Sequence, residues 1–152
     1  MGANSDFVEL FRTFNTAEVR FLVVGGYAVI FHTEPRYTKE IDIWIDPTPE
    51  NAGRAYRALA DFGAPLDGVT TADLTDQRMI YQIGVEPNRI DIIMGVPGID
   101  FGPAFERSVA TSYGGQPIRV LALDDLVTAK KAAGRARDLL DVESLEQKRS
   151  KD

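Results

Sequence analysis

The chain has 152 residues, 44% of them hydrophobic, and no cysteine, which suits a single domain over residues 1–152 and excludes disulfides, thiol nucleophiles and cysteine-based zinc sites. The net charge of -6 argues against broad, charge-driven binding of nucleic acid, although a local basic patch is still compatible with phosphate contacts. The N-terminus lacks a signal-peptide pattern, and the longest apolar stretch, 21–31, is too short for a membrane span. We therefore expect a cytoplasmic protein without membrane association.

A first helix is predicted from Asn4 or Ser5, either of which is a suitable N-cap, to about Thr16, because large apolar residues recur at helical spacing. The apolar run 21–24 then predicts a buried strand. A short helix follows to about His32, the only histidine. No nucleophile-elbow sequence accompanies this histidine, so the sequence gives little support to a Ser-His-Asp triad.

Two glycines, Gly25 and Gly26, separate the strand from the short helix, which is predicted to begin at Tyr27. Glycine allows a tight turn and a close approach of a ligand to the backbone, and a helix N-terminus offers free N–H groups to a phosphate. A glycine pair taken alone is more simply an ordinary strand-to-helix turn. The residues that follow decide between these two interpretations.

The segment 40–46 alternates acidic and isoleucine residues and predicts a strand with one acidic face. Glu40 and Asp42 share this face about 6–7 Å apart, and at an effective dielectric constant of about 20 they repel each other by about 2–3 kcal/mol. On an open surface the two acids are simply solvated, whereas in a cleft they require a cation. Arg36 and Lys39 in the preceding loop are either solvated or available to triphosphate oxygens.

The remaining elements follow from similar patterns of apolar residues, glycine and proline. They are a helix over 49–62, a polar loop over 64–77, a hairpin of strands 78–85 and 89–94, a helix over 101–109, a hairpin closed by Gly114 and Gly115, a helix over 126–133 capped by Asp124 or Asp125, a last helix to about Gln147, and a frayed tail over 148–152. This order predicts an α/β fold with helices packed on a mixed sheet and a helical C-terminus.

A third acid, Asp91, lies among isoleucines in the second strand of the first hairpin, which we expect beside the strand of Glu40 and Asp42. An acid in such a run is either solvated or needs a partner. Three carboxylates on neighbouring strands suit a hard divalent ion such as Mg²⁺. Two such ions can align an attacking hydroxyl, a phosphorus atom and a leaving group.

In combination these features resemble the nucleotidyltransferase superfamily, whose fold is like the catalytic core of DNA polymerase beta. The resemblance rests on the order of a strand, the glycine pair, Glu40-x-Asp42 and the later Asp91. The stretches VGGYAVIFH and PRYTKEIDIWID look most like small bacterial members of the abortive-infection toxin type. The resemblance covers the chain from about Phe21 to about Leu145.

The resemblance implies a nucleotidyltransferase-like fold and an enzyme that transfers a nucleoside monophosphate from a nucleoside triphosphate to an acceptor hydroxyl. Glu40, Asp42 and Asp91 are then the catalytic residues and the ligands of two Mg²⁺ ions. Gly25 and Gly26 would hold the triphosphate. Arg36 and Lys39, in the loop before Glu40, would assist them.

The basic cluster over 130–138 has two interpretations. Arg137 and Asp141 stand at i, i+4 and would pair on a solvated helix face. Toxin-type members of the family carry a lysine and a later aspartate in this region, which map onto Lys130 and Asp138 as further nucleotide-binding residues.

The resemblance suggests three classes of acceptor: a tRNA end, a protein hydroxyl or a small antibiotic. A tRNA acceptor needs a basic groove, for which the sequence offers Lys130, Lys131, Arg135 and Arg137. A toxin would also have an antitoxin partner, and a second subunit in a homodimer is another way to complete the acceptor site.

Glu40 departs from the family pattern, which has aspartate at this position. The departure favours an alternative hypothesis, a non-catalytic nucleotidyltransferase-like domain that binds a nucleotide or a partner protein. A plain α/β domain with solvated acids is the third interpretation.

Overall fold

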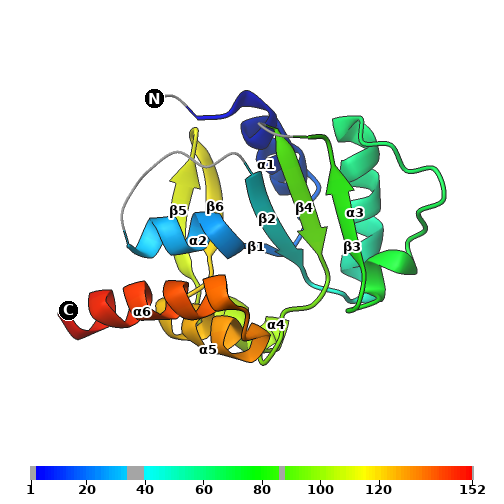
Figure 1. Cartoon of the computed structure of the whole chain (residues 1–152). Coiled ribbons are helices and arrows are strands. Elements are labelled where there is room, and N and C mark those ends of the chain that lie inside the picture. The colour runs from blue at the N-terminus through cyan, green and yellow to red at the C-terminus, as the bar shows by residue number, and fades with distance from the viewer. Residues whose placement is uncertain (1–2, 34–39, 86–87, 152) are drawn as a thin grey trace.

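The computed structural model describes residues 3–33, 40–85 and 88–151, so Arg36 and Lys39 lie outside the described residues. Its elements are α1 (Ser5–Thr16), β1 (Phe21–Val24), α2 (Gly25–His32), β2 (Glu40–Ile45), α3 (Pro49–Phe62), the 3-10 turn η1 (Asp73–Thr75), β3 (Ile80–Ile83), β4 (Arg89–Ile93), α4 (Phe101–Arg107), β5 (Val109–Tyr113), β6 (Gln116–Val120), α5 (Leu123–Ala133) and α6 (Ala136–Lys151). Helices α1 and α3 lie behind the sheet and α2 lies in front of it, next to α5 and α6 (Figure 1). This arrangement confirms the predicted α/β fold with a mixed sheet.

The sheet has the strand order β3-β4-β2-β1-β6-β5. Strand β2 runs parallel to β4 and antiparallel to β1, so the sheet is mixed. This register places Asp42 opposite Asp91 of β4 on one side and opposite Val24, the last residue of β1, on the other. The chain therefore enters α2 directly beside Asp42, and this neighbourhood positions the candidate site.

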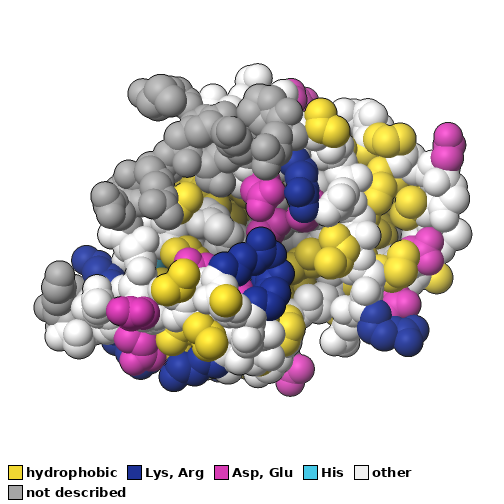
Figure 2. All heavy atoms as spheres, in the orientation of Figure 1, with side chains coloured by type: hydrophobic (Ala, Val, Ile, Leu, Met, Phe, Trp, Pro, Cys, Tyr) yellow, Lys and Arg dark blue, Asp and Glu magenta, His cyan; other side chains and the backbone are white. Residues whose placement is uncertain are grey.

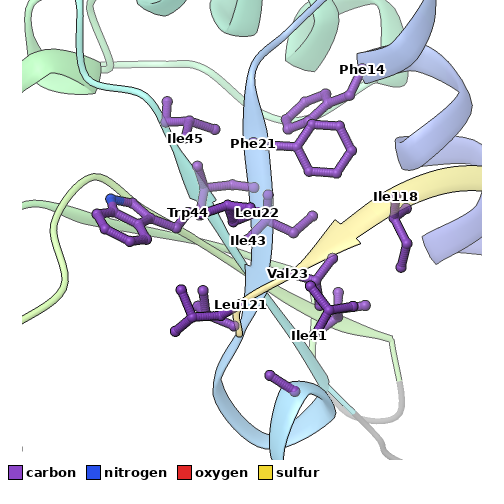
Figure 3. Close-up of a cluster of buried hydrophobic side chains, with 14 of the residues drawn as sticks. Phe14, Phe21, Leu22, Val23, Ile41, Ile43, Trp44, Ile45, Ile118 and Leu121 are labelled. Atoms are coloured by element: carbon purple, nitrogen blue, oxygen red, sulfur yellow. The ribbon is translucent and has the colours of Figure 1, made fainter. Parts of the chain in front are cut away.

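Apolar side chains from both layers form the core between the sheet and the rear helices. Phe14 of α1 meets Phe21 of β1 edge to face, with ring centroids 5.4 Å apart (Figure 3). Ile43 and Ile45 have no exposed surface, as their predicted apolar face requires. Burying each side chain of this size contributes about 1.5–3 kcal/mol.

Trp44 lies on the same face of β2 as Glu40 and Asp42, and it makes the far end of this face apolar and buried. The indole is only 2% exposed and packs edge to face on Phe101 of α4, and Figure 3 shows it pointing away from Phe14 and Phe21. Helix α4 thus covers one end of this face and leaves the acidic end open. Among the described residues, the indole Nε1 is the buried side-chain polar atom without a hydrogen-bond partner.

Several predicted boundaries need correction. Helix α2 begins at Gly25 rather than at Tyr27, and α4 ends at Arg107, so Val109 belongs to β5. Strand β3 is shorter than predicted because Gly84, with a φ of +73°, turns the chain away after Ile83. The predicted N-cap of α1 is confirmed, since the side chain of Asn4 accepts hydrogen bonds from two amides of the first turn.

The C-terminal helices also differ from the prediction. Helix α5 begins at Leu123 with Ala122 as its N-cap, so neither predicted aspartate caps it. Asp125 instead accepts two hydrogen bonds from Arg107. Helix α6 continues to Lys151, past the predicted end at Gln147, and Arg149 supports its last turns by pairing with Glu146 and with Asp124 of α5.

His32 has a structural contact: its Nε2 donates a hydrogen bond to the carbonyl oxygen of Leu121 at 2.7 Å. This bond ties the end of α2 to the residue after β6. No helix within the described ranges has the length and apolar character needed to cross a membrane.

Candidate active site

A cleft with a volume of about 710 Å³ opens where β1 ends and where β2 and β4 begin. The strands supply its acidic side and α5 and α6 supply basic residues. Figure 2 shows acidic side chains at the centre of this face with basic side chains on either side of them. The charged residues that line the cleft are Glu40, Asp42, Arg89, Asp91, Lys130, Arg135, Arg137 and Asp138.

The three acids predicted as a site lie together on the strands. Glu40 and Asp42 follow the same face of β2, and Asp91 is the register partner of Asp42 on β4. Neighbouring strands are about 4.8 Å apart, so the carboxylates of Asp42 and Asp91 are close neighbours. The predicted position of Asp91 beside β2 is confirmed, and the catalytic and metal-binding roles of the three residues stay predictions.

Asp42 is the electrostatically strained member of this group. Burial, the charges of Asp91 and Glu40 and a hydrogen bond with Asp91 together raise the pKa of its carboxyl group to about 7, against the amide of Gly26, which lowers it. Burial and the neighbouring negative charges both disfavour the ionised carboxylate, and a nearby cation would offset both effects. The geometry therefore supports the expectation, made from the sequence, that the acidic face needs a cation.

Gly25 makes the close approach of α2 to Asp42 sterically feasible. A Cβ atom at this position would lie 1.9 Å from Oδ2 of Asp42, and the backbone φ is +66°, a conformation that glycine adopts without a steric penalty. A Cβ at Gly26 would meet nothing within 4 Å. The first glycine is thus required by the carboxylate beside it, while the role of the pair in phosphate binding stays a prediction.

Arg89 is a site residue that the sequence reasoning did not single out. Its Nε and Nη2 atoms donate hydrogen bonds to Asp91 Oδ1 (3.1 Å) and Oδ2 (3.0 Å), and Nη1 lies 3.6 Å from Glu40 Oε2. The hydrogen bonds to Asp91, and then its charge, raise the pKa of the guanidinium group above its ordinary value. The alternation of a strand, which puts residues i and i+2 on one face, was the signal that linked Arg89 to Asp91.

The opposite wall of the cleft is built around Asp138, which has no exposed side-chain surface. Arg135 donates to it at 2.6 Å and Lys130 at 3.3 Å, and hydrogen bonds from Arg135 are the main reason that the pKa of this carboxyl group falls to about 2. Lys130 also lies 3.0 Å from Asp141. The predicted pair of Arg137 and Asp141 is wrong, because the ion pair of Asp141 within the described residues is with Lys130 and not with Arg137.

The basic groove predicted for a tRNA acceptor is smaller than expected. Lys131 lies 3.6 Å from Glu146 and is not part of the cleft lining, whereas Lys130, Arg135 and Arg137 line it. Of these three, Arg137 forms no ion pair with any residue in the described ranges. Its guanidinium group is accordingly the one in this wall that is available to a bound anion.

We expect replacement of Asp138 by asparagine to lower the free energy of unfolding by about 1–3 kcal/mol at pH 7, because the change removes the charge that holds Lys130 and Arg135. Since the pKa of Asp138 is lowered to about 2, its stabilising effect is present above about pH 4 and is lost as the pH falls from there toward 2. Urea unfolding of both proteins across pH 2–7 measures the effect.

Asp124 serves as the matched control, because it is 77% exposed and also pairs with an arginine, Arg149. Its replacement by asparagine is expected to cost less than about 1 kcal/mol. Equal losses for the two variants would contradict the structural role of Asp138.

The donor set on the strands fits a divalent metal ion. All three side chains offer carboxylate oxygens, which hard ions such as Mg²⁺ prefer, and the raised pKa of Asp42 marks a shortage of positive charge there. Within the described ranges, however, no group of three or more histidine, aspartate or glutamate side chains is arranged so that it could hold a metal ion. The ion pair of Arg89 with Asp91 and Glu40 is the contact that a bound ion has to share or replace.

Comparison with solved structures identifies a common fold. Over 95% of this chain and 97% of the other, the structure is similar to the lincosamide antibiotic adenylyltransferase LnuA, solved with lincomycin bound, at a TM-score of 0.59 and 14% identity. It is also similar to the antibiotic-resistance factor ANT(2'')-Ia (TM-score 0.58, 13% identity, 96% and 88% of the two chains). A proposed nucleotidyltransferase from Thermotoga maritima gives a TM-score of 0.56 at 14% identity over 96% and 91%.

At these identities the similarity establishes the nucleotidyltransferase-like fold. No protein-family model matches the chain. No curated protein matches its sequence either.

Proposed function

We propose that the protein is a metal-dependent nucleotidyltransferase. The observation that carries the proposal is the pairing of Asp42 with Asp91 at the N-terminus of α2, inside a cleft whose opposite wall is basic. The acidic side of the cleft would complement a divalent ion, and the basic wall would complement a polyphosphate. The fold shared with nucleotidyltransferases supports the same conclusion.

In the proposed reaction an acceptor hydroxyl oxygen forms a bond to the α-phosphorus of a nucleoside triphosphate, and the bond to the β-phosphate oxygen breaks to release pyrophosphate. Mg²⁺, when bound, supplies positive charge to the phosphates and acidifies the acceptor hydroxyl. Glu40, Asp42 and Asp91 would hold it. Asp91 would accept the proton of the hydroxyl, and the catalytic effect would come mainly from positioning and charge neutralisation.

The basic wall would bind the triphosphate. Lys130 is held between Asp138 and Asp141, which fixes its ammonium group at the cleft. Arg137 lines the same wall with its guanidinium group unpaired among the described residues, and arginine can grip phosphate with two donors. We therefore assign the direct phosphate contact to Arg137 and a supporting position to Lys130.

Replacement of Arg137 by glutamine is expected to weaken nucleoside triphosphate binding about tenfold or more, because one charge-assisted contact is lost. Isothermal titration calorimetry in Mg²⁺ buffer measures the dissociation constant. Arg54→Gln on α3, an exposed arginine on the other side of the sheet, is the control and should bind as the wild type does. Identical binding by all three proteins would remove Arg137 from the phosphate site.

The proposed function itself is tested by titrating each of the four common nucleoside triphosphates into the wild-type protein and into Asp42→Asn, with Mg²⁺ and with EDTA. We expect one nucleotide or more to bind the wild type only when Mg²⁺ is present and to bind the variant far more weakly. A nucleotide affinity that is the same with Mg²⁺ and with EDTA, and the same for the wild type and Asp42→Asn, would contradict a metal-dependent site at Asp42.

The acceptor class and a toxin role extend this proposal. A tRNA end, a protein hydroxyl and a small antibiotic are the three candidates, and they are separated by the size and chemistry of the product that carries the label. The lincomycin bound to LnuA is an example of a small molecule held by the same fold. Neutralisation of the protein by a cognate antitoxin, or an acceptor site shared in a homodimer, would follow from the toxin-type resemblance.

The ion pair of Arg89 favours one alternative function, a non-catalytic domain that binds a nucleotide or a partner protein. An internal cation already faces Asp91 and Glu40, and Glu40 stands where the family has aspartate. A domain of this kind would bind the same ligand equally well with and without Mg²⁺, and it would release no pyrophosphate. Measurements of the Mg²⁺ dependence of binding and of pyrophosphate release therefore distinguish this binding domain from the proposed enzyme.

A further inference from the structure

Arg89 lies against the acidic residues that would have to receive a metal ion. Resting on the proposed function, we infer that Arg89 is an internal counter-ion of the acidic site, which divalent metal displaces on binding. Its side chain holds both carboxylate oxygens of Asp91 and reaches Glu40 as well. A metal ion needs oxygens of the same carboxylates, so the guanidinium group and the ion compete for them.

The charges at the site make this exchange favourable. One guanidinium group faces three carboxylates, and its hydrogen bonds go to Asp91 rather than to Asp42. A single positive charge cannot neutralise three carboxylates, so the neutralisation by Arg89 is incomplete. A divalent ion brings twice the charge of the guanidinium group to the same oxygens, and it relieves the repulsion that Arg89 leaves.

The guanidinium group can leave without rearrangement of the sheet. Arg89 is the first residue of β4, and 34% of its side-chain surface is exposed to solvent. The site therefore has two states, a closed one with Arg89 on Asp91 and an open one with Arg89 in solvent. Metal binds the open state alone, so its apparent affinity is reduced by the fraction of molecules that are open.

Variants of Arg89 measure this reduction. If about nine molecules in ten are closed, Arg89→Gln is expected to bind Mg²⁺ about tenfold more tightly than the wild type, and Arg89→Lys, which keeps the charge but loses the two-pronged contact, should fall between them. Arg107→Gln is the matched control, because Arg107 makes the same two-pronged contact with Asp125 outside the cleft. Calorimetric titration with Mg²⁺ alone gives the dissociation constants.

The displacement itself has a spectroscopic signature in the wild-type protein. The ¹⁵N–¹H resonance of the Arg89 Nε group, assigned through Arg89→Gln, is expected to move on addition of Mg²⁺ to the position of a solvated arginine. The resonance of Arg107 should stay where it is and serves as an internal control. A loss of charge at Arg89 would tighten metal binding in any case, so the movement of this signal is the decisive readout.

The outcomes separate this inference from the function on which it rests. If Mg²⁺ binds but the Arg89 signal stays unchanged at saturation, or if Arg89→Gln binds no more tightly than the wild type, the counter-ion role is overturned and the metal site stands. If neither the wild type nor Arg89→Gln binds Mg²⁺ at millimolar concentrations with or without a nucleoside triphosphate, both the inference and the proposed function are overturned.

Discussion

Replacement of Asp42 by asparagine is expected to lower nucleotide transfer by about a thousandfold while making the metal-free protein more stable at pH 8. Asparagine has nearly the same shape as aspartate but carries no charge, so it removes a proposed metal ligand and at the same time the repulsion with Asp91 and Glu40. An ordinary structural residue would lose stability and activity together. Opposite signs of the two effects are therefore specific to a site built for a cation.

The stability effect depends on pH in a defined direction. The pKa of Asp42 is raised to about 7, so between about pH 4 and 7 the folded protein binds a proton that the unfolded chain has released, and the free energy of unfolding falls as the pH rises through this window. The Asp42→Asn variant has no carboxyl group at this position, so its free energy of unfolding does not fall for this reason as the pH rises. We expect the variant to gain about 2–4 kcal/mol over the wild type at pH 8 and nothing below about pH 4.

Urea unfolding in EDTA at pH 4, 6 and 8 tests the expected trend. Asp61→Asn, an exposed acid on α3 and outside the cleft, is the control and should follow the wild type at each pH. A stability gain that does not grow with pH, or an Asp42→Asn variant that is less stable than the wild type at pH 8, would contradict the assignment of Asp42 as the strained member of the site.

Replacement of Gly25 by alanine is the second large effect, and it is expected to lower the free energy of unfolding by about 2–4 kcal/mol. The new Cβ would lie 1.9 Å from Oδ2 of Asp42, and the positive φ of +66° adds a backbone penalty. Either α2 or Asp42 must move, so proposed metal and nucleotide binding should be lost even under conditions in which the variant is folded.

The neighbouring glycine gives a control of the same chemistry. A Cβ at Gly26 would meet nothing within 4 Å, and this residue lies inside the first turn of α2, where alanine is favoured over glycine by about 0.5–1 kcal/mol. Gly26→Ala should therefore be as stable as the wild type or more stable, and it keeps the backbone N–H. Thermal unfolding of the two variants measures the contrast, and equal destabilisation would show that the close approach to Asp42 is not the cause.

The sheet and the position of the acids were predictable because they depend on local patterns. Alternation in 40–45 fixed the acidic face of β2, and a hairpin brought Asp91 to the next strand, which the register confirms. The ion pair of Lys130 with Asp138 was not predicted. The family resemblance indicated both residues only as nucleotide-binding residues, and the sequence pattern alone favoured a pair between Arg137 and Asp141.

Features that depend on several elements at once were not predictable. Asp125 resembles a helix cap in sequence, but Arg107 of α4 lies close enough to take its carboxylate. The steric need for Gly25 follows from the antiparallel pairing of β1 with β2, which sets Val24 opposite Asp42. Arg89 reaches Glu40 because the register of β2 and β4 sets these two residues opposite each other, and this register depends on both strands.

The most direct test of the proposed reaction is incubation of the wild-type protein and Asp42→Asn with α-³²P-labelled nucleoside triphosphates, Mg²⁺ and fractions of tRNA, protein and small metabolites. We predict that the wild type attaches label to one of these fractions and releases an equal amount of pyrophosphate, and that Asp42→Asn does neither. Equal labelling by both proteins, or no labelling with any nucleotide and any fraction, would contradict the assignment of the cleft as a nucleotidyl-transfer site.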